Sequence, residues 1–161
     1  MKAEYPITPA VRALRARKID FRPHVYPYVD HGGTRWAAES LQVAEHAIIK
    51  TLVMETDARS PLIVLMHGDC EVSTKRLARA LDTKRIAPCE TAVAERLTGF
   101  QVGGISPLGT RTRLAVYGEA SIFKLEKIFI NGGKRGFLIE IDPRSLKQAL
   151  ACREVHVALC P

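Results

Sequence analysis

Short apolar runs separated by polar turns predict a chain rich in β-strands. Segments 48–55 and 62–66 are apolar and β-branched, and the polar stretch 57–61 between them predicts a strand–turn–strand unit. In segment 137–141, Phe137, Ile139 and Ile141 alternate with other residues, so they share one face of a strand. Asn131-Gly132-Gly133 predicts a tight turn before this strand. Further strands are expected at 21–28, 84–87, 113–117, 127–130 and 155–159.

Helices are expected where a capping residue precedes an apolar repeat. Thr8 and Pro9 suit the N-cap and first position of one helix, and Ser73 and Asp142-Pro143 suit the starts of two others. Further helices are expected at 36–43 and 91–97. Strands outnumber helices and are joined by hairpins and by helical crossovers. This order predicts an α/β fold with a mixed, barrel-like sheet and helices packed around it, in a single domain over residues 1–161.

Composition narrows the class of protein. With 47% hydrophobic and 25% charged residues the chain is typical of a soluble globular domain, and no apolar run approaches the roughly 20 residues that span a bilayer. The segment 1–6 does not resemble a secretory signal, so we expect a cytoplasmic protein without a membrane partner. A net charge of +7 favours a polyanionic partner such as nucleic acid, although many basic domains have none.

Cysteine and histidine spacing argues against a disulfide or metal site. The four cysteines are scattered and form no Cys-x-x-Cys pair, so we expect reduced thiols: Cys70, Cys89, Cys152 and Cys160. The five histidines show no metal-ligand spacing either, and no cofactor is predicted. Ser106 lacks the strand–elbow–helix context of a hydrolase nucleophile, which disfavours a Ser-His-Asp site.

Three segments could carry chemistry without a protein nucleophile. Gly103 and Gly104 lie in a glycine-rich loop whose N–H groups could hold an oxyanion or a polarised carbonyl. Lys50 lies inside an apolar strand, where an ammonium needs an anion or water; it either holds a phosphate or carboxylate or simply extends to solvent. Lys134 and Arg135 follow the turn and could contact phosphate or remain solvated.

Four segments together resemble the YbaK/EbsC family of free-standing aminoacyl-tRNA editing domains, which is similar to the editing domain of bacterial prolyl-tRNA synthetase. The segments occur in the family's order between about residues 8 and 151: 8–11, 50–52, 99–109 and 131–136. The resemblance implies a barrel-like α/β domain that removes a mischarged amino acid from tRNA, often cysteine from tRNA for proline. It implies tRNA as partner, with prolyl-tRNA synthetase as a further one.

The resemblance also implies site residues. Lys50 matches the strand lysine that holds the 3′ end of the substrate, and Gly103 and Gly104 match the loop that faces the ester carbonyl. Substrate-binding positions carried over in the same way are Tyr26, Trp36, Thr51, Ile105, Ser106, Pro107, Asn131, Gly132, Gly133, Lys134 and Arg135.

One position departs from the cysteine-specific pattern, because Leu138 stands where those members tend to have an acidic residue. Alanine, serine or another small amino acid is therefore an alternative to cysteine. The hypothesis is that the two glycine amides polarise the carbonyl, Lys50 anchors the terminal nucleotide, and water or the substrate's own thiol attacks. Alternatives are a non-catalytic nucleic-acid-binding or regulatory protein of the same fold and a domain that binds a small phosphate.

Overall fold

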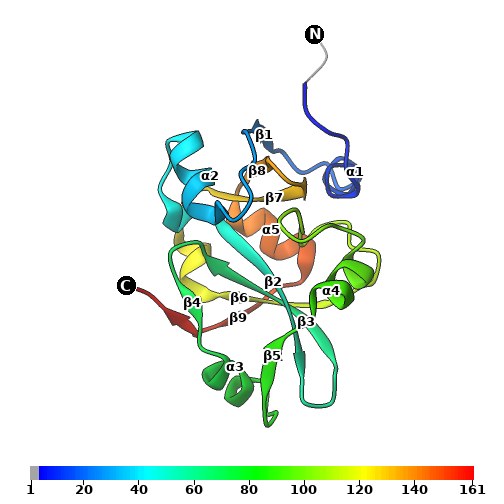
Figure 1. The fold of residues 1–161 in the computed structure, drawn as a ribbon, viewed down its shortest axis with the longest axis vertical. Coiled ribbons are helices and arrows are strands. Elements are labelled where there is room, and N and C mark those ends of the chain that lie inside the picture. Colours follow the sequence, from blue (N-terminus) through cyan, green and yellow to red (C-terminus); the bar gives the residue numbers. More distant parts are fainter. Residues whose placement is uncertain (1–3) are drawn as a thin grey trace.

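The computed structural model describes residues 4–161 and is built around a five-stranded sheet (Figure 1). Its strand order is β5-β2-β3-β6-β9, and the bounds are β2 Ile49–Thr56, β3 Pro61–His67, β5 Ile86–Pro88, β6 Ala115–Glu119 and β9 Arg153–Val155. The hairpin β2–β3 is antiparallel, whereas β3–β6 and β6–β9 are parallel. The strand–turn–strand prediction for 48–66 is thus confirmed. Parallel pairing requires crossovers, and these bring helices onto the sheet.

Two smaller sheets flank the central one. The first has the order β1-β8-β7, with bounds Arg22–Val25, Phe137–Ile141 and Ile128–Lys134, and the second pairs β4 (Glu71–Val72) with β10 (Ala158–Leu159). A single bridge between Ile48 and Phe129 joins the start of β2 to β7. The mixed α/β class with packed helices is confirmed, although these described sheets do not close into a barrel.

Three helices begin where their capping residues predict, whereas the helix expected at 36–43 begins earlier, at Gly33, without a side-chain cap. Thr8 accepts a hydrogen bond from Val11 N, Ser73 from Arg76 N and Asp142 from Arg144 N. The helices and 3₁₀ turns are α1 Pro9–Ala16, α2 Gly33–Leu41, η1 Glu45–Ala47, α3 Thr74–Ala80, α4 Thr91–Thr98, η2 Ala120–Lys124 and α5 Pro143–Leu150. Figure 1 shows α1 and α2 beside the three-stranded sheet and α3 at the opposite end, beside β5. No described helix is both long and apolar enough to pass through a lipid bilayer.

The largest buried cluster lies between the central sheet and the three-stranded sheet. Ile63 and Leu65 of β3, Ile130 of β7 and Ile139 of β8 are buried there together with Leu14 of α1. This packing fixes the two sheets relative to each other and so fixes any site between them.

Three expectations from the sequence are wrong in detail. Asn131–Gly133 is not a turn but part of β7, where the pairing register shifts between Asn131 and Lys134. The reversal falls at 135–136, where Gly136 has φ +80°. The expected first strand, 21–28, is confined to Arg22–Val25 because Pro27 follows, and the expected last strand divides into β9 and β10.

The cysteines also differ from expectation. Cys70 and Cys160 form a disulfide across 90 residues, whereas Cys89 and Cys152 are free. The spacing of the cysteines along the sequence could not indicate this disulfide, because Cys70 and Cys160 come together only where β4 pairs with β10. The segment 1–6, which is not expected to be a secretory signal, begins with Met1–Ala3, and these three residues lie outside the described part of the chain.

Candidate functional site

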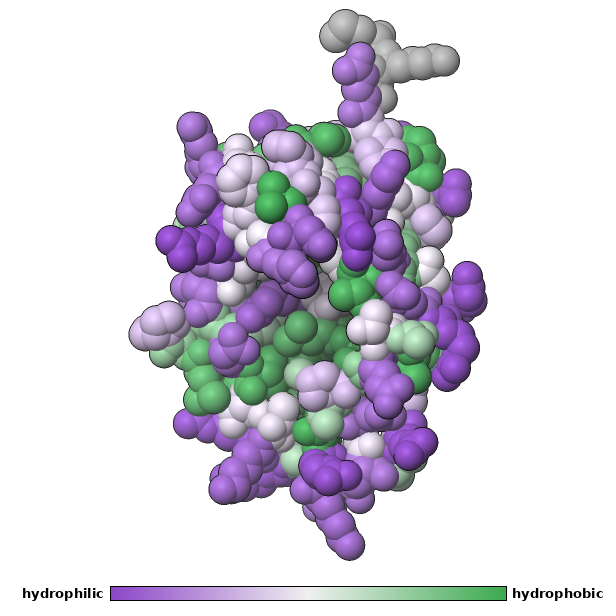
Figure 2. Space-filling model, viewed as in Figure 1, coloured by the Kyte–Doolittle hydropathy of each residue, from purple (hydrophilic) through white to green (hydrophobic). Residues whose placement is uncertain are grey.

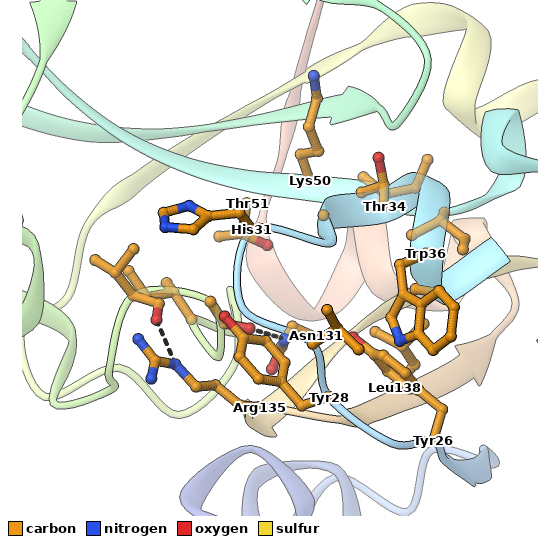
Figure 3. A pocket seen from close by; sticks show the side chains of 18 of the residues that line it. Tyr26, Tyr28, His31, Thr34, Trp36, Lys50, Thr51, Asn131, Arg135 and Leu138 are labelled. Carbon is orange, nitrogen blue, oxygen red and sulfur yellow. Dashed lines mark hydrogen bonds between the residues drawn. The ribbon is translucent and has the colours of Figure 1, made fainter. Parts of the chain in front are cut away.

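A cavity of about 470 Å³ lies between the two larger sheets. Four segments form it: the chain around the start of α2, the first half of β2, the glycine loop near Gly103, and the strands β7 and β8. Figure 2 shows a hollow with apolar side chains near the middle of this face, surrounded by hydrophilic ones. The lining residues used below are Tyr26, Tyr28, His31, Thr34, Trp36, Lys50, Thr51, Gly103, Ile105, Asn131, Arg135 and Leu138 (Figure 3).

The glycine loop is held against β7 and β8 by a side chain of β7 and one of the turn that follows it. Asn131 Nδ2 donates to Gly103 O at 3.0 Å, and Arg135 Nε donates to Val102 O at 2.9 Å (Figure 3). Glu95 of α4 accepts a hydrogen bond from Val102 N at 2.8 Å. Three hydrogen bonds, from β7, from the β7–β8 turn and from α4, thus fix a loop that has no helix or strand of its own.

Glycine is needed at two positions of this loop for different reasons. Gly103 has φ +94°, and a Cβ there would lie 2.7 Å from Tyr28 Oη. A Cβ on Gly104 would lie 2.8 Å from the backbone nitrogen of Arg135. Because Gly104 has no Cβ, the backbone of the loop can pack directly against the backbone of the β7–β8 connection.

The two glycine amides are not equivalent donors. Gly104 N donates to Gln101 O at 2.8 Å, so its N–H is already engaged within the loop. The N–H of Gly103 has no acceptor among residues 4–161. Of the two glycines expected to face a substrate carbonyl, Gly103 lines the cavity and has a free N–H among the described residues, whereas Gly104 does neither.

Aromatic side chains form one wall. Trp36 Nε1 donates to Pro27 O at 2.7 Å, which fixes the indole plane. Arg135 lies over the ring of Tyr28, with its Cζ 5.2 Å from the centroid. Burial raises the pKa of Tyr26 above 10.0, with a smaller contribution from Tyr28, so its phenol stays neutral and can donate a hydrogen bond.

Lys50 and Thr51 bring polar groups from β2. Lys50 Nζ donates to Cys70 O at 2.5 Å, and Figure 3 shows its ammonium directed away from Asn131 and Arg135. Two of its three N–H donors remain for a ligand. Thr51 Oγ1 is buried and has no hydrogen-bond partner among the described residues. A buried hydroxyl without a partner is costly, so Thr51 has an unmet hydrogen bond in this arrangement.

The structure brings together about half of the residues expected from sequence. The cavity is lined by Tyr26, Trp36, Lys50, Thr51, Gly103, Ile105, Asn131 and Arg135. Six others lie outside its lining: Gly104, Ser106, Pro107, Gly132, Gly133 and Lys134.

The residues outside the lining have structural contacts instead. Ser106 is fully buried and accepts a hydrogen bond from Leu108 N. Gly132 O accepts the hydroxyl of Thr8, and Pro107 lines a separate groove beside α1. Gly133 packs against Phe100 and Thr8, and Lys134 is exposed.

Sequence reasoning missed Tyr28, His31 and Thr34, which also line the cavity. Tyr28 could have been found from the sequence, because it lies two residues after Tyr26 and so shares its face in an extended segment. His31 and Thr34 enter only because α2 folds back over the cavity, which no local pattern reveals.

Comparisons with known proteins agree on one family. The model of the aminoacyl-tRNA editing domain matches residues 34–149. A protein of Enterococcus faecalis named as a candidate Cys-tRNA(Pro)/Cys-tRNA(Cys) deacylase, EbsC, is 29% identical over 140 residues, covering 86% of this chain and 85% of the relative. A proline–tRNA ligase of Lactobacillus delbrueckii subsp. bulgaricus is 28% identical over 97 residues, which are 60% of this chain and 17% of the ligase.

Solved structures show the same fold. A hypothetical protein, APE2540, superposes with a TM-score of 0.87 at 22% identity, covering 94% of this chain and all of that one. A protein described as a candidate trans-editing enzyme for prolyl-tRNA synthetase superposes with a TM-score of 0.82 at 19% identity, covering 96% and 99%. Since the family match extends over well more than half of its residues, the chain belongs to the aminoacyl-tRNA editing domain family.

Proposed function

We propose that this protein hydrolyses the ester bond between a mischarged amino acid and the 3′ end of its tRNA. The observation that supports the proposal is the cavity itself, which is lined by aromatic residues, Lys50 and Gly103 in a chain of the editing family. An ester is already activated, so positioning and one main-chain hydrogen bond to the developing oxyanion can supply much of the rate.

Each group has a role in this proposal. The rings of Tyr26 and Trp36 stack on the terminal base, and Lys50 contacts the 3′ nucleotide with the two donors that Cys70 O leaves free. The N–H of Gly103 polarises the ester carbonyl, and water or a substrate thiol attacks the carbonyl carbon, releasing the tRNA 3′ hydroxyl.

Cys-tRNA(Pro) is our first choice of substrate, because the Enterococcus relative carries that name. Leu138 and Ala37 give the cavity an apolar wall, which also suits alanine or another small side chain. We place the protein in the cytoplasm, where charged tRNA occurs, and propose prolyl-tRNA synthetase as the enzyme whose errors it removes.

The test is a deacylation panel with tRNAs charged with cysteine, alanine, serine and proline. We expect release of at least one non-cognate amino acid, and we expect Lys50→Ala to lower kcat/KM by about 10- to 100-fold, the value of one charged hydrogen bond. Lys84→Ala is the matched control, because Lys84 is exposed and outside the cavity.

Two results would contradict the proposal. Tight binding of tRNA without release of any amino acid would indicate the non-catalytic alternative. Equal turnover by the Lys50 variant and the wild type would remove Lys50 from the site.

A further inference from the structure

A second group of reactive side chains lies beside the cavity, on the turn that accepts the Lys50 ammonium. His46 Nδ1 lies 2.8 Å from Asp69 Oδ1, and Cys70 Sγ lies 3.4 Å from the same oxygen. These three donor atoms lie within 4.8 Å of one another. The fourth member is Cys160, whose sulfur is bonded to that of Cys70.

We propose that His46, Asp69, Cys70 and Cys160 form a zinc site when the disulfide is reduced. A nitrogen, a carboxylate oxygen and two thiolates are a ligand set that Zn²⁺ prefers, and four protein ligands make a closed tetrahedral site. Ligand distances of about 2.0–2.3 Å to zinc place neighbouring donors roughly 3.3–3.8 Å apart. The Cys70–Asp69 pair is already at 3.4 Å, whereas the two sulfurs, and His46 and Asp69 at 2.8 Å, must move apart to admit the ion. The inference rests on the proposed function in one respect: a protein acting on tRNA works in a reducing compartment, where Cys70 and Cys160 are thiols.

The chemistry balances with a dithiol as reductant. The dithiol supplies two electrons and two protons, becomes a disulfide itself, and leaves two thiols on the protein. Each thiol then releases one proton as its sulfur binds Zn²⁺. The two thiolates and Asp69 bring three negative charges to the two positive charges of the ion. The ammonium of Lys50, on the carbonyl of Cys70, offsets the remaining charge.

The surrounding structure orients the proposed ligands. The ring of His46 stacks on that of His67 at a centroid distance of 3.7 Å, and His67 Nδ1 bonds His46 O at 2.7 Å. Gly68 N donates to Ile48 O, and a Cβ on Gly68 would lie 2.8 Å from Glu45 O. Contacts of this kind hold metal ligands in place before the ion arrives.

The C-terminal segment reaches the site without help from the disulfide. The buried carboxylate of Glu119 accepts hydrogen bonds from Val157 N at 2.7 Å and Ala158 N at 2.9 Å. Ser73 N donates to Val157 O, and β10 pairs with β4. Reduction therefore leaves Cys160 beside Cys70, in reach of the same ion.

The test uses the full chain treated with a phosphine reductant and titrated with Co²⁺ alone, then with Zn²⁺. We expect one equivalent of Co²⁺ with the thiolate-to-cobalt absorption of a tetrahedral site, and its displacement by Zn²⁺. The oxidised protein should show neither. His46→Ala should weaken Co²⁺ binding about tenfold or more, and Cys160→Ser should reduce the thiolate absorption. Cys89→Ser is the control and should bind like the wild type, because Cys89 lies outside this cluster.

Failure to bind Co²⁺ after reduction, or equal binding by Cys70→Ser, would overturn the proposal. Circular dichroism shows whether each variant folds, and the His46 variant keeps the test decisive if a cysteine variant does not fold, because His46 is only partly buried. Deacylation is measured separately, so that failure of the zinc proposal and failure of the editing proposal are distinguished.

Discussion

Cys152 shows how burial alone changes the chemistry of one side chain. Cys152 is 7% exposed and belongs to the largest buried cluster, and its sulfur would lie only 3.0 Å from a Cβ on Gly118. Burial raises the pKa of Cys152 from 9.0 to about 12, partly offset by the charge of Lys147. The folded protein therefore keeps this proton over a range in which the unfolded chain has lost it.

This difference predicts a loss of stability in alkali. Below pH 9.0 the thiol is protonated in both the folded and the unfolded state, so its raised pKa does not change the free energy of unfolding. As pH rises from 9.0 toward 12, the unfolded state is favoured by about 1.4 kcal/mol per pH unit. We expect the stability advantage of wild type over Cys152→Ala to shrink across that range, measured by urea unfolding in a series of buffers.

Val116→Ala is the control, because it also truncates a buried side chain but removes no titratable group. Its stability difference from the wild type should not change with pH. A constant difference for Cys152→Ala as well would show that the thiol ionises as easily in the folded state as in the unfolded one.

At the scale of elements, local chemistry predicted the helix starts and long-range pairing decided the rest. Thr8, Ser73 and Asp142 cap their helices because each side chain needs only a backbone N–H two or three residues ahead. The Asn131–Gly133 segment suited a turn equally well on local grounds. Its place in β7 depends on pairing with β8 and on packing against Thr8, neither of which is local.

The same distinction applies to the cavity. Lys50 could be recognised because an ammonium in an apolar strand is unusual, and the glycines because they cluster. His31 and Thr34 could not, since their approach to β2 depends on how α2 packs. Cys70 and Cys160 are 90 residues apart, and only the fold shows that they meet.

The glycine loop offers a sharp test of how elements position one another. Asn131 uses both ends of its amide: Oδ1 accepts from Gly133 N at 2.8 Å, and Nδ2 donates to Gly103 O. In Asn131→Asp the carboxylate still accepts the hydrogen bond from Gly133 N, but its second oxygen faces Gly103 O and cannot donate to it. We expect about 1–3 kcal/mol lower stability and a fall in kcat of tenfold or more, since Gly103 moves.

Gln101→Glu is the matched control, because it makes the same change from amide to carboxylate on an exposed side chain of the same loop. It should retain both stability and turnover. If both variants lost activity equally, the added negative charge near the tRNA would explain the effect, and the hydrogen bond to Gly103 would not.

At the scale of the whole molecule, the C-terminal segment ties distant parts together. Glu119 at the end of β6 holds residues 157–158, β10 covers β4, and Cys160 reaches the turn that accepts Lys50. The cavity is therefore connected, through Lys50 and Cys70, to the last strand of the chain. A change at this terminus can reach the proposed active site without entering it.

The overall charge of +7 leads to the last prediction. A polyanionic substrate gains affinity from released counterions, and each phosphate contact contributes about 0.7–0.9 to the slope of log affinity against log salt. For three contacts, a fourfold rise in salt weakens binding roughly 20- to 40-fold. We expect the KM for charged tRNA to rise by about this factor in potassium chloride, with kcat little changed because the chemistry occurs in the cavity.

An aminoacyl-adenosine, which lacks the tRNA phosphates, is the matched substrate, and its KM should be almost independent of salt. Equal salt dependence for the two substrates would place the effect inside the cavity, on Lys50 and Arg135, rather than on the basic surface.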